Sequence, residues 1–222
     1  MNVLVQTADG SNTLFNPIIG EHYHSAHGAL QESEHVFIQS GLKHFLSLNE
    51  ENHVHILEVG FGTGLNFILT LDFCLQNNIG LQYTGIEAFP LSVDIIEQTG
   101  YQNFVTPKTW NIFISAYEKA KMGKVQLTPT CTLEIKHLSL DHFISADKYD
   151  IVYYDAFSVR HQPEMWSNEI IAHTCNFLKS GGIFITYAIT GNLKRAVKSC
   201  GFEIEKIKGA PGKREMLRAL KH

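Results

Sequence analysis

The stretch Ile56-Leu57-Glu58-Val59-Gly60-Phe61-Gly62-Thr63-Gly64-Leu65-Asn66 decides the fold. In it an apolar run ends in an acid, three glycines alternate, and an apolar helical pattern then begins. Glycine lets the backbone turn sharply and approach a ligand closely, and the start of a helix favours a negative group. The stretch therefore predicts a buried strand, a ligand-binding turn and a helix in succession.

The spacing of the glycines separates two kinds of cofactor. A dinucleotide fingerprint, G-x-G-x-x-G, would require glycine where Leu65 stands, whereas the third glycine comes one residue earlier. The observed [DE]-x-G-x-G-x-G resembles the S-adenosylmethionine loop, and Glu87 ends a second predicted strand, where an acid would bind ribose hydroxyls. We expect this cofactor to be held by Glu58, Gly60, Gly62, Gly64, Asn66 and Glu87. The alternative is a tight turn beside an ordinary surface glutamate.

Strand and helix patterns alternate along the rest of the chain. The predicted strands are His53–Val59, Gln82–Glu87, Thr132–Leu138, Tyr149–Asp155, Gly182–Ala188, Phe202–Lys208 and Glu215–Lys221. The predicted helices are Leu65–Asn77, Leu91–Thr99, Glu164–Leu178 and Asn192–Cys200. Such alternation implies a parallel sheet covered on both faces. The last two strands should instead form an antiparallel hairpin, because only Gly209–Gly212 separates them.

The predicted fold class is therefore α/β, with a doubly wound, mostly parallel seven-stranded sheet and a C-terminal antiparallel hairpin. This is the Rossmann-like plan of class I methyltransferases. We expect residues 51–222 to form the methyltransferase domain and residues 1–50 to form an N-terminal extension that covers the cofactor pocket. By analogy with the fold, adenine should lie near the end of the third strand, at Leu138 and its neighbours His137 and Asp141. His137 is equally well explained as an exposed strand residue.

Composition limits the class of protein. The 222 residues, 44% of them hydrophobic, suffice for one buried core, and no apolar run reaches the roughly 18–20 residues that cross a bilayer. The N-terminus carries no positive charge before its short apolar stretch, unlike a secretion signal. Four cysteines lie far apart without a CxxC pair, which suits reduced thiols better than disulfides or zinc. We expect a cytoplasmic protein without membrane contact.

The charge of the chain is distributed unevenly. Residues 1–193 hold 9 Lys and Arg against 19 Asp and Glu, whereas residues 194–222 hold 9 against 3. A basic segment on an otherwise acidic chain is typical of contact with a polyanion such as RNA. The alternative is a solvated helix face beside an edge strand guarded by lysines.

Asp155 ends the fourth predicted strand and is followed by Ala156 and Phe157. Ligands of open α/β sheets bind beyond the carboxyl ends of the strands, so Asp155 should face both cofactor and substrate. Methyltransferases that act on adenine or cytosine amines often carry Asn/Asp-Pro-Pro-aromatic here, and the different motif indicates another acceptor. A carboxylate suits a cationic amine, by orientation and electrostatics more than by strong base catalysis unless burial shifts both pKa values. The alternative is a carboxylate that caps a loop.

At this point the sequence resembles one family, the methyltransferase domain of the tRNA wobble-uridine modification enzymes of the MnmC and MnmD type. The matching stretches are Tyr23–Ala29, Glu32–Ile38, Gly60–Asn66, Asp155–Val159 with Pro163–Trp166, Gly181–Arg195 and Gly201–Met216. The resemblance implies methyl transfer from S-adenosylmethionine to the 5-aminomethyl amine of (2-thio)uridine at the wobble position, giving 5-methylaminomethyl. Val159, Asn192 and Lys194 depart from the family pattern but leave Asp155 and the glycines intact.

Further cofactors and protein partners are not expected. Bifunctional relatives append a flavin-dependent oxidase, but the chain has no second glycine fingerprint and ends at His222, so no FAD is expected. His22, His24 and His27 suggest a metal site, yet no carboxylate pair or cysteine stands at ligand spacing, so no metal is expected. No obligate protein partner is inferred.

The N-terminal block and the basic tail supply the remaining candidate residues. The resemblance implies that Tyr23, Ser25 and Glu32 contact the methionine part of the cofactor, although Glu32 could equally cap a helix from Leu30 to Phe45. Contact with the tRNA substrate is expected of Phe157, Trp166, Lys194, Arg195, Lys213 and Arg214. Trp166 could stack on the base or be a buried core residue.

Two other functions are alternatives to tRNA methylation. One is a class I methyltransferase that acts on a small-molecule or protein amine. The other is a binding module that has lost turnover, for which damaged glycines or a missing Asp155 would be expected, and neither occurs. The matched stretches and the basic tail favour tRNA.

Overall fold

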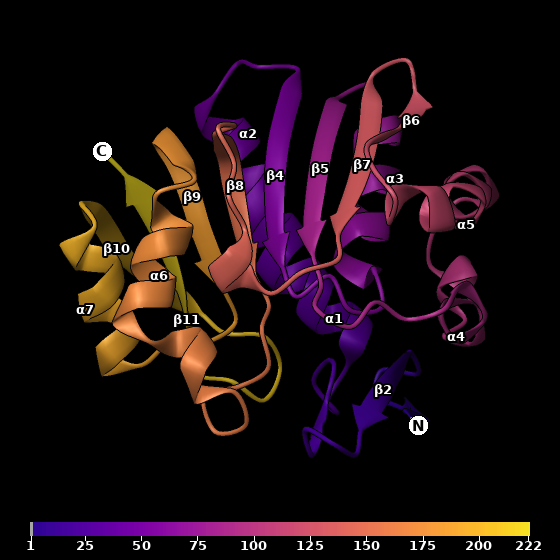
Figure 1. Cartoon of the computed structure of the whole chain (residues 1–222), viewed down its shortest axis with the longest axis horizontal. Coiled ribbons are helices and arrows are strands. Elements are labelled where there is room, and N and C mark those ends of the chain that lie inside the picture. The colour runs from indigo at the N-terminus through magenta and orange to yellow at the C-terminus, as the bar shows by residue number, and fades with distance from the viewer. Residues whose placement is uncertain (1) are drawn as a thin grey trace.

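Five parallel strands form the centre of the main sheet in the computed structural model, which describes residues 2–222. They are β7 (Cys131–Lys136), β5 (Gly80–Ile86), β4 (His53–Val59), β8 (Tyr149–Tyr154) and β9 (Leu178–Thr186), in that spatial order (Figure 1). Nearly every residue of β4 and β8 is buried, as expected for central strands covered on both faces. The carboxyl ends of these strands all lie at one edge of the sheet, where the glycine loop begins.

Antiparallel strands close both sides of the sheet. The strand β11 (Glu215–Lys221) pairs with β9 on one side and with β10 (Phe202–Lys208) on the other, which confirms the predicted hairpin. At the opposite side β6 (Val125–Thr128) pairs antiparallel with β7. The sheet therefore has eight strands, one more than the sequence patterns predicted.

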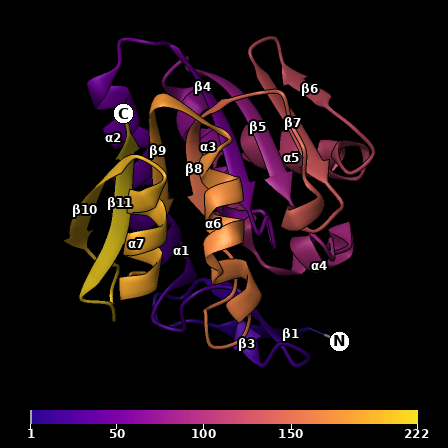
Figure 2. The same ribbon diagram turned by 60° about the vertical axis from the view of Figure 1, so that its left-hand side comes forward.

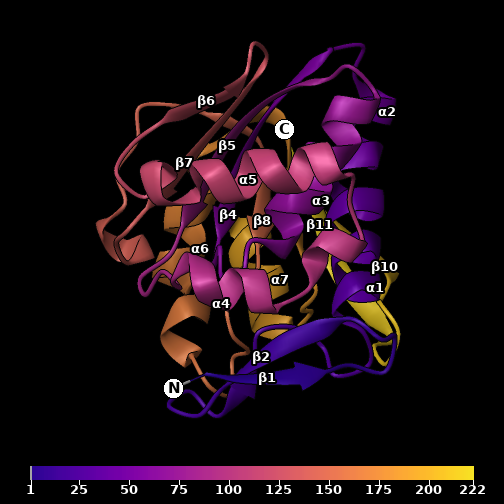
Figure 3. The ribbon, with the colours of Figure 1, turned by 90° about the vertical axis from the view of Figure 1, so that its right-hand side faces the viewer.

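Helices cover the two faces of the sheet. One face carries α3 (Leu65–Gln76), α5 (Pro107–Ala120) and α4 (Val93–Gln98) (Figure 3). The other carries α6 (Asn168–Cys175) and α7 (Gly191–Ser199) (Figure 2). Each face has its own cluster of buried apolar side chains. No helix of residues 2–222 is long and apolar enough to span a membrane.

One predicted helix is divided. In place of a single helix from Glu164 to Leu178, the structure has a 3-10 turn at Pro163–Trp166 followed by α6. The division falls at Ser167, whose hydroxyl accepts a hydrogen bond from the Ile170 amide and so begins a new helix. Leu178 already belongs to β9. Two further short 3-10 turns occupy Tyr101–Asn103 and Leu140–His142.

The N-terminal residues form a small sheet and a long helix. The strands β1 (Val3–Gln6), β2 (Asn12–Asn16) and β3 (Glu21–His22) pair antiparallel. The helix consists of α1 (Ala29–Ser33), a π-helical stretch η1 (Glu34–Lys43) and α2 (His44–Leu48). Its apolar side chains belong to the same buried cluster as α3 and α5. The small sheet lies beyond the carboxyl ends of the central strands (Figure 1).

Candidate active site

The glycine loop between β4 and α3 lies against the residues that end β8. Gly60 has a φ of +84°, and a Cβ placed there would lie 2.5 Å from the Asp155 carbonyl oxygen. Gly62 has a φ of +52°, and a Cβ there would lie 3.0 Å from the Tyr23 ring. Only glycine combines the left-handed backbone with so little room. The loop therefore offers bare backbone at this edge of the sheet.

Glu87 follows β5 and faces the same loop. Its carboxylate accepts a hydrogen bond of 2.8 Å from the Gly62 amide and one of 3.0 Å from the Phe89 amide. Both bonds fix the orientation of the acid beside the loop. The structure thus places Glu87 beside the glycine loop, and its role in binding ribose hydroxyls stays a prediction.

A buried polar network joins the glycine helix to Asp155. The Asn66 side-chain nitrogen donates to Glu58 Oε1 and to Asp155 Oδ2, each at 2.8 Å. The Tyr83 hydroxyl donates to the other oxygen of Glu58 at 2.9 Å. Both amide hydrogens of Asn66 are therefore used, whereas its Oδ1 is buried without a hydrogen-bond partner among residues 2–222. This oxygen remains available to a ligand's N–H or O–H donor.

Burial changes the acidity of both carboxyl groups in this network. Desolvation raises the pKa of Glu58 well above its usual value, and the charge of Asp155 adds to this effect. Desolvation raises the pKa of Asp155 to about 7, and the charge of Glu32 contributes in the same direction. The hydrogen bond from Asn66 and the charge of Lys213 oppose the rise. Asp155 is thereby poised to exchange a proton near neutral pH.

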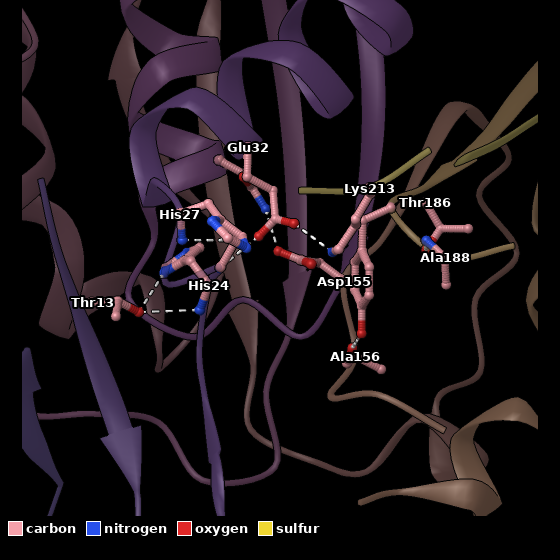
Figure 4. A network of polar contacts seen from close by, with 12 residues as sticks. Thr13, His24, His27, Glu32, Asp155, Ala156, Thr186, Ala188 and Lys213 are labelled. Carbon is pink, nitrogen blue, oxygen red and sulfur yellow. Dashed lines mark hydrogen bonds and ion pairs between the residues drawn. The ribbon is translucent and has the colours of Figure 1, made fainter. Parts of the chain in front are cut away.

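Glu32 on α1 adds a further carboxylate near Asp155. It accepts a hydrogen bond of 2.7 Å from the Ser25 amide and forms a 2.6 Å ion pair with Lys213 of the β10–β11 hairpin (Figure 4). The Lys213 ammonium also lies 3.8 Å from the centre of the Tyr187 ring. The hydroxyl of Tyr187 donates to the Ala156 carbonyl at 2.9 Å. Segments from both ends of the sequence thus meet beside Asp155.

Aromatic side chains adjoin the same region. The rings of Tyr23 and Phe157 meet edge to face, with centroids 5.1 Å apart. The loop that carries Phe157 is tied to β3, because the Ser158 amide donates to Glu21 at 2.8 Å. Trp166 is only 8% exposed, and its indole nitrogen donates to the Phe157 carbonyl at 2.8 Å. Trp166 therefore lies in the core and is not exposed for stacking on a base.

The basic residues expected to contact tRNA fall into two places. Lys194 and Arg195 lie on α7 and line a surface groove of about 390 Å³ together with Lys198 and Lys206. Arg214 is exposed on the hairpin, whereas Lys213 is directed inward to Glu32. Leu138 lies just after β7, where its amide donates to the Lys136 carbonyl. The groove on α7 is separate from the residues around Asp155.

Sequence reasoning missed two residues of this site. Tyr187 follows β9 and contacts both Lys213 and Ala156, and Tyr83 of β5 holds Glu58. Tyr187 lies within a stretch that resembles the family, but its spacing carries no signal of its own. Tyr83 alternates with other apolar strand residues and is not distinguishable from core. Their roles follow only from the three-dimensional contacts.

The N-terminal histidines have structural partners. His24 is buried, and its Nδ1 lies 3.1 Å from the Thr13 hydroxyl. His27 lies so close to Gly212 that a Cβ there would come within 2.3 Å of its ring. Within residues 2–222 no three His, Cys, Asp or Glu side chains are grouped so that they could hold a metal ion.

A family model described as S-adenosyl-L-methionine-dependent methyltransferase matches residues 106–222, which is more than half of the chain. The chain belongs to this family. The fold class and the family resemblance expected from the sequence are thereby confirmed. The glycine loop, in which a Cβ would collide, and the unpartnered Asn66 oxygen fit the cofactor named in the family description.

Individual relatives agree with this assignment. The tRNA 5-methylaminomethyl-2-thiouridine biosynthesis bifunctional protein MnmC of Idiomarina loihiensis is 31% identical over 209 residues, which are 88% of this chain and 34% of that protein. The MnmC protein of Magnetococcus marinus is 27% identical over 231 residues, with 97% and 34% covered. The chain thus spans about a third of the length of these relatives.

A solved structure shows the same fold. The crystal structure of MNMC2 from Aquifex aeolicus superposes with a TM-score of 0.79 at 22% sequence identity, covering 99% of this chain and 70% of that one. This likeness extends over the central sheet and the N-terminal residues alike. It establishes the architecture in which the site residues are placed.

Proposed function

We propose that this methyltransferase acts on tRNA and methylates the 5-aminomethyl amine of (2-thio)uridine at wobble position 34, giving 5-methylaminomethyl-(2-thio)uridine. The observation that carries the proposal is Asp155, a carboxylate beside the glycine loop whose Oδ2 is held by Asn66. The names of the MnmC relatives, which describe tRNA 5-methylaminomethyl-2-thiouridine biosynthesis, support the choice of acceptor.

The cofactor would be held by residues around the glycine loop. Backbone at Gly60, Gly62 and Gly64 would lie against S-adenosylmethionine, and Glu87 would bind its ribose hydroxyls. The unpartnered Oδ1 of Asn66 is a hydrogen-bond acceptor for a donor group of the cofactor. Ser25, Glu32, Tyr23 and Leu138 complete the proposed contacts. Glu58 is fully buried and bonded to Asn66 and Tyr83, so it would act indirectly by holding Asn66. When bound, the cofactor supplies an electrophilic methyl group.

Asp155 would bind the acceptor amine and take its proton. An aliphatic ammonium has a pKa of about 10, and an ordinary aspartate, at about 4, is a weak base toward it. Burial raises the pKa of Asp155 to about 7, which reduces this mismatch. Because Oδ2 is fixed by Asn66, the other oxygen is the one that would face the amine. The Asp155 carboxylate would then both orient the acceptor amine and accept its proton.

The wall of the substrate pocket is assigned to aromatic residues. Phe157 follows Asp155 by two positions, and its ring is supported by Tyr23. A flipped uridine could stack on such a surface. Trp166 would act indirectly, because its indole hydrogen bond holds the backbone of Phe157.

The tRNA backbone would lie along the basic groove on α7. Lys194 and Arg195 line that groove, and Arg214 is exposed on the neighbouring hairpin. Phosphate contacts of this kind position a nucleic acid without reading its sequence. We further propose that the protein works in the cytoplasm and that residues 1–50 cover the cofactor pocket, since Tyr23 already touches Gly62.

Nucleoside mass spectrometry tests the proposal directly. The protein is incubated with S-adenosylmethionine and tRNA that carries 5-aminomethyluridine, and the digested nucleosides are compared with a reaction lacking protein. We expect a gain of one methyl group on that nucleoside alone. Cofactor binding by calorimetry without any methyl gain would overturn the assigned acceptor and direct the search to other amines.

A further inference from the structure

The side chain of Lys213 is half-buried and points to Glu32, although its neighbours Gly212 and Arg214 are exposed. Its ammonium forms the 2.6 Å ion pair with Glu32 and lies over the Tyr187 ring. The turn that carries it is fixed, because the Lys213 amide donates to the Ala210 carbonyl at 2.8 Å. A Cβ on Gly209 would lie 2.5 Å from the Lys213 carbonyl oxygen, so the backbone there is closely packed. The ammonium is thus held in place rather than free to reach a phosphate.

The charges around Lys213 come from four elements. Glu32 on α1 and Asp155 after β8 are the carboxylates nearest Lys213, and Tyr187 after β9 is their neutral neighbour. Glu58 of β4 is linked to Asp155 through the Asn66 amide. Glu21 of β3 faces Tyr187, and His24 is near enough to Glu32 to feel its charge. Burial keeps His24 uncharged, since its pKa falls to about 4. The positive charge of Lys213 thus offsets the negative charge of Glu32 beside Asp155.

We propose that Lys213 is a positioning residue for the acceptor amine: it neutralises Glu32, so that Asp155 alone faces the amine, and its positive charge favours the uncharged form of that amine. The inference rests on the proposed function. Without Lys213, two carboxylates would stabilise the ammonium form, which has no lone pair for attack. The same loss would raise the pKa of Asp155, so that a smaller fraction of this carboxyl group would be ionised and able to accept a proton at neutral pH.

The chemical step balances with these groups alone and the methyl donor. The ammonium gives one proton to the Asp155 carboxylate, which leaves a neutral amine. The nitrogen lone pair then forms the new N–C bond while the C–S bond of the donor breaks and its electron pair stays on sulfur. The product is a secondary ammonium, and Asp155 returns its proton to water.

The pH dependence of turnover tests the proposal in three variants. Lys213→Met removes the charge, Lys213→Gln keeps a hydrogen-bond donor for Glu32 without charge, and Lys213→Arg keeps the charge. In Lys213→Met and Lys213→Gln we expect the rising limb of the kcat profile to move by about one pH unit to the alkaline side. The value of kcat should then fall about tenfold at pH 7 and change little at pH 9. KM for the aminomethyl tRNA should not rise, and Lys213→Arg should restore the wild-type profile.

Other outcomes would overturn the proposal. A loss of kcat by the same factor at every pH would assign Lys213 a structural role, and a raised tRNA KM with weaker salt dependence would assign it to phosphate. Thermal melts show whether each variant is folded.

A second readout needs no substrate and so separates this inference from the proposed function. Carboxyl 13C NMR of the ligand-free protein follows the Asp155 titration, assigned with Asp155→Asn. Its pKa should rise in Lys213→Gln, and an unmoved titration would overturn the inference even if tRNA is methylated. If the wild-type protein fails to methylate aminomethyl tRNA, the proposed acceptor is wrong whatever the NMR shows.

Discussion

Asn66 donates a hydrogen bond of 2.8 Å to Asp155, although 89 residues separate them in the sequence. The same nitrogen donates to Glu58 at the end of β4, so one side chain of α3 fixes carboxylates from two adjacent strands. The helix that begins at the glycine loop therefore also orients Asp155. The helix that follows the glycine loop, Glu58 and Asp155 are therefore joined in one hydrogen-bonded unit.

Asp155→Ala should lower turnover and spare cofactor binding. Loss of a positioned proton acceptor costs roughly 10²- to 10³-fold in rate. The dissociation constant for S-adenosylmethionine should change by less than about threefold, because the proposed cofactor contacts lie on other residues. Single-turnover methyl transfer and calorimetry measure the two effects, with Asp94→Ala on the exposed face of α4 as the matched control. An unchanged rate in Asp155→Ala would refute its assigned role.

Asn66→Ala should change both the pH profile and the stability. Without its hydrogen bond, the pKa of Asp155 rises further, so the rising limb of kcat moves to higher pH. Buried Glu58 and half-buried Asp155 both lose a hydrogen-bond donor, and the free energy of unfolding should fall by about 1–3 kcal/mol. Urea unfolding and a pH series measure these changes, and Asn111→Ala on the exposed side of α5 is the control. Superimposable pH profiles for Asn66→Ala and wild type would contradict the prediction.

Gly62→Asp should abolish binding of S-adenosylmethionine. The residue has a positive φ, its side chain would meet the Tyr23 ring, and its charge would lie beside Glu87. Gly123→Asp is the matched control, because a Cβ at Gly123 meets nothing within 4 Å. Calorimetry should show no binding for the first variant and wild-type affinity for the second. Equal affinities would place the cofactor away from this loop.

Acid should destabilise the protein through His24. Burial lowers the pKa of His24 to about 4, below its usual 6.5, so the unfolded chain binds more protons between these values. Neutral His24 makes its full contribution to the free energy of unfolding above about pH 6.5, and this contribution is lost as the pH falls toward 4. At pH 5 the loss amounts to about 2 kcal/mol. His24→Gln should therefore lose less stability between pH 7.5 and pH 5 than wild type. Identical losses in urea unfolding would disprove this role.

Substitution of both Lys194 and Arg195 by Ala should weaken tRNA binding. Two phosphate contacts contribute about 1.5–2 to the slope of log K against log salt concentration, and the double variant should lose that part. KM for tRNA should rise several-fold at constant kcat. The control is Lys108→Ala with Lys124→Ala, which removes the same charge from exposed positions on another side of the sheet. Equal salt slopes for the two double variants would remove α7 from the tRNA surface.

Local sequence patterns were sufficient to predict most strands of the main sheet. The bounds of β4, β10 and β11 agree with the prediction, because each strand is delimited by turn residues or polar residues. Helix α5 was missed although a signal was present, since Thr106 and Pro107 form a helix start with Phe113 and Tyr117 on one buried face. Strand β6 was also missed, because its four half-buried or exposed residues are too few to distinguish a strand from a loop.

Contacts between residues far apart in the sequence limited how much of the candidate site could be predicted. The glycine loop, Glu87 and Asp155 were predictable because each stands at the end of a strand, and parallel strands bring such ends together. The pairing of Glu32 with Lys213 spans 181 residues and leaves no trace in local spacing. Lys213 and Arg214 look alike in the sequence, yet only the former turns inward, because the hairpin turn gives the two side chains different directions.

The meeting of Glu32 with Lys213, together with the position of β11 between β9 and β10, has a consequence for biosynthesis. A nascent chain can form the glycine loop and the parallel strands while its later residues are still inside the ribosome. The ion pair and the two strand pairings of β11 must wait until residues 213–221 have emerged. The surroundings of Asp155 can therefore be completed only after the glycine loop has had the opportunity to form.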